Sequence, residues 1–203
     1  MPYLVRLQLP DSSVVSALST DADPPVPGTR LVVATGAARE IATVLETSST
    51  SMDAPDSGMG RIAGPVDADM ERAASVAETQ AAAALGAFAQ LLRRDGLAVR
   101  PVKAHFDLDR RRLIVWYIPP QGGTDLKPLE GEFRRKVRAS SVDLRAVAPR
   151  EAAALLGGIG CCGRPLCCAS WLRRQTGAAR NGPATFSATG LCGLGRCCHS
   201  FDE

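Results

Sequence analysis

The chain has 203 residues, of which 45% are hydrophobic and only 4% aromatic, and its formal net charge is +3. This length suits one or two small globular domains, with a core that alanine, leucine and valine must fill. No run of 18 apolar residues is present and the N-terminus lacks the apolar region of a signal peptide. We therefore expect a cytoplasmic protein that does not insert into a membrane.

The first part of the chain, residues 1–66, is predicted to be rich in β structure. Alternating or β-branched runs occupy residues 3–9, 31–34 and 39–45, and turn signals separate the last two. They predict a small antiparallel barrel or curled sheet. Residues 47–66 are rich in Ser, Gly and Pro, which indicates a mobile loop or linker.

A long helix is predicted to follow. Acidic residues begin it, Arg93 and Arg94 end it, and Gly96 suits the position after its end. Its apolar side chains recur at three- and four-residue steps and form one stripe: Met70, Ala74, Ala77, Ala81, Leu85, Phe88 and Leu92. Packing of this stripe on the protein's own sheet is favoured over binding of a partner.

Residues 67–150 are predicted to form one α+β domain. Two strands, 98–108 and 111–118, meet at a tight turn at Asp109-Arg110. A second helix is marked by Leu126, Leu129, Phe133 and Val137, and a third strand by residues 142–147. The order α-β-β-α-β suggests two layers, with helices on one face and an antiparallel sheet on the other.

The same region carries most of the positive charge. Residues 100–150 hold 12 basic and 6 acidic side chains, net +6, whereas residues 1–99 hold 7 and 12, net −5. The basic residues within 110–112 and 134–138 could contact RNA phosphates, and Trp116 and Tyr117 could stack on bases. The alternatives are a solvated helix face and core aromatics, and no RNA-binding signature decides between them.

The last part, residues 151–203, is a cysteine-rich arm. The pattern C-G-x-x-x-C-C occurs twice, thirty positions apart, and contains six of the seven cysteines: Cys162, Cys167, Cys168, Cys192, Cys197 and Cys198. The seventh, Cys161, is extra to the repeat. This arm has few large apolar residues, so we expect it to owe much of its order to a bound metal.

Three kinds of cysteine chemistry fit these two cysteine boxes, residues 162–168 and 192–198. Disulfides are rare in the cytosol, which disfavours them here. A structural zinc site takes four ligands, often at C-x2-4-C spacing, and the four residues between Cys162 and Cys167 lie at the edge of that range. An iron–sulfur cluster also accepts C-x4-C spacing. One [4Fe–4S] cluster would leave two of the six thiolates over and two clusters would lack two, so a partner that contributes ligands is the economical hypothesis.

The residues around the boxes resemble the RicT (YaaT) family of bacterial proteins, which carry the PSP-one C-terminal domain. The resemblance rests on Leu155-Leu156-Gly157-Gly158-Ile159-Gly160, on both cysteine boxes and on Gly190-Leu191, and extends by pattern upstream to about Pro27. It implies a non-enzymatic regulator that assembles with RicA and RicF, shares [4Fe–4S] ligands with them, and acts with the ribonuclease RNase Y in mRNA maturation.

The sequence also departs from the family pattern. Cys161 stands where the family has Pro, and Asn181-Gly182-Pro183 replaces part of an Asn-Pro-x-Lys pattern. We therefore expect the six box cysteines, and not Cys161, to be the metal ligands.

Catalysis has little support in the sequence. His105 and His199 are the only histidines, and we expect His105 to pack or to hydrogen-bond locally. His199 follows Cys198, but adjacency in sequence is weak support for a role at a metal, and the family pattern has no histidine there. A zinc-stabilised nucleic-acid-binding module remains the main alternative, and a thiol oxidoreductase built on the adjacent cysteines is a second one.

Overall fold

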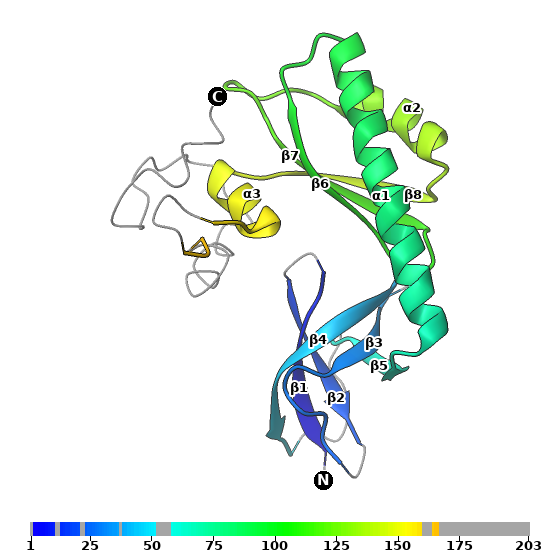
Figure 1. Ribbon diagram of the computed structural model, residues 1–203, viewed down its shortest axis with the longest axis vertical. Helices are drawn as coiled ribbons and strands as arrows, with labels where there is room; N and C mark the ends of the chain where they lie inside the picture. The colour runs from blue at the N-terminus through cyan, green and yellow to red at the C-terminus, as the bar shows by residue number, and fades with distance from the viewer. Residues whose placement is uncertain are drawn as a thin grey trace. The chain divides into compact units, whose positions relative to one another are not determined.

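The computed structural model describes residues 2–10, 13–20, 23–36, 38–51, 58–159 and 164–166. In this part of the chain the protein is α+β, with eight strands and three helices (Figure 1). The chain divides into two compact units. The first comprises Met1–Ala83, His105–Leu113 and Ala139–Ser141, and the second comprises Ala84–Ala104, Ile114–Arg138 and Val142–Glu203.

The first unit contains a curled, five-stranded antiparallel sheet. Its strands are β1 (Tyr3–Gln8), β2 (Val14–Ser19), β3 (Arg30–Thr35), β4 (Ala38–Ser49) and β5 (Arg61–Pro65), arranged in the order β2-β1-β4-β3-β5. The two outer strands approach each other, because Ala17 of β2 forms a bridge with Gly60, the residue before β5. The Gly60 N–H donates to the Ser16 carbonyl at 2.9 Å. The predicted curled sheet is confirmed.

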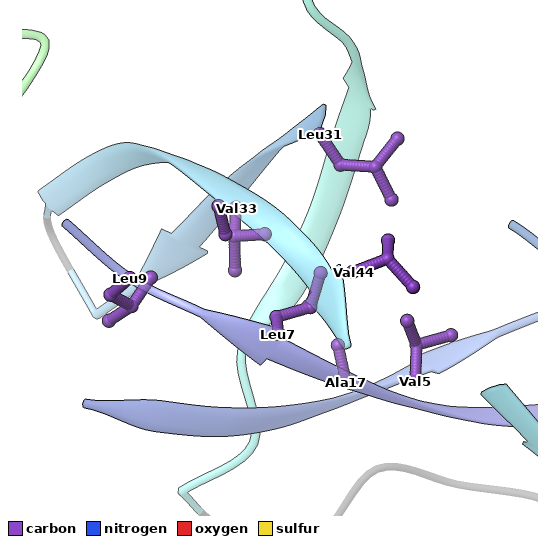
Figure 2. Packing of buried hydrophobic residues seen from close by; sticks show 8 residues of the cluster. Val5, Leu7, Leu9, Ala17, Leu31, Val33 and Val44 are labelled. Atoms are coloured by element: carbon purple, nitrogen blue, oxygen red, sulfur yellow. The ribbon is translucent and has the colours of Figure 1, made fainter. Parts of the chain in front are cut away.

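The concave side of this sheet holds its core. Val5 and Leu7 alternate along β1 and Leu9 directly follows its last residue, so that all three side chains point to the same face. Figure 2 shows them facing Leu31, Val33 and Val44, with Ala17 beside them. Most of these side chains are fully buried.

Two of the five strands were not predicted. Strand β2 lacked a clear alternation, and β5 lies within residues 47–66, which their composition marked as loop. The loop prediction is wrong at both ends of that range, because β4 continues to Ser49 and Arg61–Pro65 pairs with β3. Ile62 packs against the core, and this burial outweighs the weak strand preference of Gly64 and Pro65.

Helix α1 (Ala68–Arg94) follows the sequence prediction closely. Its first turn is capped by Asp67, whose Oδ1 accepts the Met70 N–H at 2.8 Å. At the other end Gly96 has φ +65°, and the Leu97 N–H donates to the Leu92 carbonyl at 2.9 Å. The buried side chains form one stripe, which includes Ala84 and Leu91 besides four predicted members: Ala77, Ala81, Phe88 and Leu92.

The second sheet has three strands, β6 (Arg100–Phe106), β7 (Arg112–Ile118) and β8 (Ser141–Ala146), in the order β6-β7-β8. Helix α2 (Lys127–Val137) connects β7 to β8, so the predicted order α-β-β-α-β is confirmed. A third helix, α3 (Pro149–Leu156), follows. None of the helices in the described ranges has the length and apolar character needed to cross a membrane.

The prediction that this sheet is wholly antiparallel is wrong at one pair. The Ser141 N–H donates to the Arg111 carbonyl, and the Val147 N–H donates to the Tyr117 carbonyl. The two contacts advance in the same direction along both chains, so β8 runs parallel to β7. Parallel neighbours require a crossover connection, and α2 provides it.

The second unit has its own core. Val102, Ile114, Trp116 and Ala152 are buried together, with Val147 and Leu155 packed against them. The rings of Phe88 and Phe133 lie 5.0 Å apart between their centroids and tilt by 48°. Both rings are fully buried, which joins α1 to α2 within this unit.

Candidate metal centre

Helix α3 leads from the second unit to the first cysteine box. Pro149 opens the helix, and the Glu151 Oε2 atom accepts the Ala148 N–H at 3.1 Å. Ala152 is fully buried in the cluster that contains Trp116. The helix therefore anchors the start of the cysteine-rich segment to the core of the second unit. It occupies the first residues of the range 151–203 that the sequence assigns to the arm.

Two glycines turn the chain after α3. Gly157 has φ +70° and Gly158 has φ +121°, both in the region that residues with a Cβ atom rarely adopt. The Gly157 N–H still donates to the Ala153 carbonyl at 2.9 Å and so completes the helix end. The Gly-Gly pair before the first box thus has a structural role, which is to reverse the chain sharply.

The described residues on either side of positions 160–163 lie side by side. Ile159 and Pro165 form an antiparallel bridge, and the Leu166 N–H donates to the Gly158 carbonyl at 3.1 Å. Leu166 is only 7% exposed. In sequence, Cys162 stands between the two bridge partners and Cys167 directly follows Leu166. The described residues that precede and follow positions 160–163 are therefore paired with each other.

The predicted ligands themselves lie outside the described residues. This applies to Cys161, to the six box cysteines Cys162, Cys167, Cys168, Cys192, Cys197 and Cys198, and to His199. Their assignment remains a prediction from the sequence. Among the residues that the structure does describe, no three His, Cys, Asp or Glu side chains group closely enough to hold a metal ion.

His105 has a partner that sequence reasoning missed. Its Nε2 atom lies 3.2 Å from the Oε2 atom of Glu40, whose side chain is only 6% exposed. The expectation that a hydrogen bond of His105 would be local is wrong here, because this contact joins residues 65 positions apart. Glu40 occupies an inward position of β4 between Ala38 and Ala42, and this alternation is the signal that could have revealed it.

The basic residues of α2 lie where the sequence placed them. Arg134, Arg135, Lys136 and Arg138 are exposed, whereas Leu129 and Phe133 face the core. Their exposure agrees with a solvated helix face, and contact with RNA remains a prediction.

The two aromatic residues of β7 differ in exposure. Trp116 is 3% exposed, so it belongs to the core and is not available to stack on a base. The guanidinium of Arg145 lies 6.0 Å from the centre of its ring. Burial raises the pKa of Tyr117, the next residue along the strand.

Comparison with known proteins adds one relative. No family model and no solved structure matches the chain. The stage 0 sporulation protein YaaT of Bacillus subtilis (strain 168) is 34% identical over 77 residues, which are 38% of this chain and 27% of YaaT. The chain thus aligns with about a quarter of the length of that relative. This match supports membership of the chain in the YaaT (RicT) family, which its cysteine boxes resemble.

Proposed function

We propose that this protein is a non-enzymatic regulatory subunit that binds an iron–sulfur cluster and acts through partner proteins in mRNA processing. The repeated C-G-x-x-x-C-C box carries the proposal, since it supplies six thiolates in two matched sets. The similarity to YaaT, a sporulation protein by name, supports a regulatory role.

The chemistry of the donor set suits iron. Thiolates are the usual ligands of [4Fe–4S] clusters, and their spacing varies among proteins. Gly163 and Gly193 each follow the first cysteine of a box and allow the backbone to pass close to a bulky cluster. Six ligands do not complete two four-iron clusters, so RicA- and RicF-like subunits are proposed to contribute the rest. A bound cluster would supply an oxygen- or iron-sensitive link between the subunits.

The described residues support a structural connection between such a cluster and the core of the second unit. The first box begins after α3, which is packed on Trp116, and the Ile159–Pro165 bridge brackets Cys162. Assembly or loss of a cluster at the boxes would act directly on this short connection. An RNase Y-like ribonuclease is the proposed target of the assembled complex.

The ligand assignment is tested by single Cys→Ser variants of the complex, purified without oxygen together with its RicA- and RicF-like partners. Bound iron should fall for Cys162, Cys167, Cys168, Cys192, Cys197 and Cys198 and stay at the wild-type level for Cys161→Ser, the matched control. Equal loss from Cys161→Ser would contradict the assignment. A colourless complex that contains zinc in place of iron would favour the zinc-stabilised alternative.

The role in RNA processing needs a separate test. The ends of cellular transcripts are mapped in the wild type, in a strain that lacks this chain, and in the Cys167→Ser strain. The proposal expects the two altered strains to share one set of unprocessed transcripts. Catalysed thiol–disulfide exchange by the purified chain, without any change in transcripts, would favour an oxidoreductase.

A further inference from the structure

An exposed proline-rich segment precedes strand β3 in the first unit. Its residues are Asp23-Pro24-Pro25-Val26-Pro27-Gly28, and we call it the Pro-rich ridge. Every residue of the ridge is exposed except Pro25, which is partly buried. Val26 is 67% exposed, although valine is among the residues most often found in the core. The ridge therefore presents apolar side chains to the outside of the protein.

The local sequence restricts the backbone of the ridge to the polyproline II conformation. Each proline ring fixes φ at about −65°. Asp23, Pro24 and Val26 each precede a proline, which excludes them from the α-helical region. Because polyproline II has about three residues per turn, Pro24 and Pro27 share one edge and Pro25 lies on another. The observed burial fits this arrangement, since Pro25 is the residue that is partly covered.

Hydrogen bonds attach the ridge to strand β4. The Thr47 hydroxyl donates to the Pro25 carbonyl at 2.7 Å. The Gly28 N–H donates to the Val44 carbonyl at 2.8 Å. The edge that carries Pro25 is thus fixed on β4, and the edges that carry Pro24, Val26 and Pro27 are left outward.

A tight turn ends the ridge. The Thr29 N–H donates to the Val26 carbonyl at 3.0 Å, with Pro27 and Gly28 as the two central residues. This order of residues and the φ of +91° at Gly28 are those of a type II turn. The ridge is therefore ordered before any partner binds, so little conformational entropy is lost on binding.

Strand β4 has a bulge in the stretch to which the ridge is attached. Arg6 pairs with Glu46 and Leu7 pairs with Val44, which leaves Leu45 without a partner in β1. Bulges of this kind redirect a side chain and are frequent beside functional sites. Leu45 is 41% exposed, so a second large apolar side chain is presented from this part of the sheet.

We propose that the Pro-rich ridge and Leu45 form a docking surface for a partner protein whose groove is lined with aromatic side chains. Such grooves bind P-x-x-P segments in a preformed polyproline II conformation, and Pro24 and Pro27 have this spacing. The carbonyls of Pro24 and Pro27 accept no hydrogen bond from the part of the chain that the structure describes. They are therefore available to tryptophan or tyrosine donors in the groove.

Other occupants suit the ridge less well. Pro24, Pro25 and Pro27 have no N–H group, so the ridge cannot pair as a strand with the sheet of a partner. Asp23 is exposed and forms no ion pair with any described residue, so it would repel nucleic acid and anionic lipid. The same charge predicts a basic residue at the matching end of the partner's groove.

Photochemical crosslinking identifies the occupant. Val26 is replaced by p-benzoylphenylalanine in the full-length chain, in the cells that produce it. Irradiation should join the chain to one protein, at a groove of that protein and beside its aromatic residues. The same replacement of Val14, which is 46% exposed in the same sheet, is the matched control and should not give this product. A product with a second copy of this chain, with nucleic acid or with lipid would contradict the proposal, as would the lack of any product specific to position 26.

The affinity of the purified partner for variants of the full-length chain tests recognition of the ridge itself. Pro24→Ala and Val26→Ser should each weaken binding by about fivefold or more, as expected of residues that contribute binding energy. Val14→Ser should leave the affinity unchanged. Asp23→Asn should weaken binding mainly at low salt, because exposed charges are screened at high ionic strength.

The midpoint of denaturation separates this role from a structural one. It should stay at the wild-type value in Pro24→Ala and Val26→Ser, because both side chains are exposed. Wild-type affinity in both variants would overturn the proposal. Weaker binding that is accompanied by a matching fall of the midpoint would also overturn it, since the ridge would then act on stability alone.

Discussion

The imidazole of His105 lies 3.2 Å from the carboxylate of Glu40, which is buried in the curled sheet of the first unit. The residue before Glu40 makes two further contacts to the same turn region. The Arg39 carbonyl accepts the Leu108 N–H at 2.9 Å, and the Arg39 guanidinium donates to Asp109. Side chains on the two faces of β4 thus hold residues 105–109 within the first unit.

Replacement of His105 by alanine should destabilise the protein by about 1–3 kcal/mol, because a buried carboxylate loses its hydrogen-bond partner. The measurement is chemical denaturation at pH 7. The double variant Glu40→Gln with His105→Ala should recover part of the loss, since an uncharged amide is easier to bury than a carboxylate. If the double variant is as unstable as the sum of the single variants, the two residues are not coupled.

The pair Arg39–Asp109 should make stability depend on pH in the acid range. The hydrogen bond from Arg39 holds the pKa of Asp109 below its usual value. A carboxylate whose pKa is lower in the folded state contributes stability above its unfolded pKa of about 4 and loses it as the pH falls through the folded pKa.

The Asp109→Asn variant should therefore be less stable than the wild type at pH 7 by about 0.5 kcal/mol, because Arg39 is half exposed and the pair is screened by solvent. The difference should shrink below about pH 4 and also in high salt. Denaturation curves from pH 3 to pH 7 measure it. A difference that stays constant over this range would exclude the ion pair as its cause.

Gly60 and Gly86 should respond oppositely to alanine. A Cβ atom on Gly60 would lie 2.8 Å from the Val33 Cγ1 atom in the core, so Gly60→Ala should cost about 1–3 kcal/mol. Gly86 is exposed within α1, and a Cβ atom there meets nothing within 4 Å. Gly86→Ala should stabilise the protein by about 1 kcal/mol through helix propensity. Equal effects would show that the approach of Gly60 to Val33 is not close in solution.

Metal removal should reduce the order of the cysteine-rich segment and leave residues 67–147 and α3 folded. Protection of backbone amides from hydrogen exchange should persist in residues 67–147 and in α3, whose Ala152 is buried beside Trp116. It should fall in the residues that follow Gly158, because ligand binding to the native state is what stabilises them. Exchange measured on complexes with and without metal checks this. Uniform loss across the chain would contradict a local role for the metal.

The sequence alone determined the elements that have strong local signals. The stripe of α1, its acidic start and its Gly96 end were all readable because helix periodicity and the signals at helix ends depend on neighbours three or four positions away. The two cysteine boxes and their resemblance to the RicT (YaaT) family were readable for a similar reason, since spacing is a property of the sequence itself. The ligand set remains a prediction, because these cysteines lie outside the described residues.

Only the tertiary structure decided features that join distant segments. Strand β5 forms because Ile62 finds a core and β3 offers its edge, although its own residues favour a loop. The parallel pairing of β8 with β7 depends on the path of α2, and the contact of His105 with Glu40 depends on the fold of 65 intervening residues. Burial and strand pairing are set by the whole chain, so no local pattern contains them.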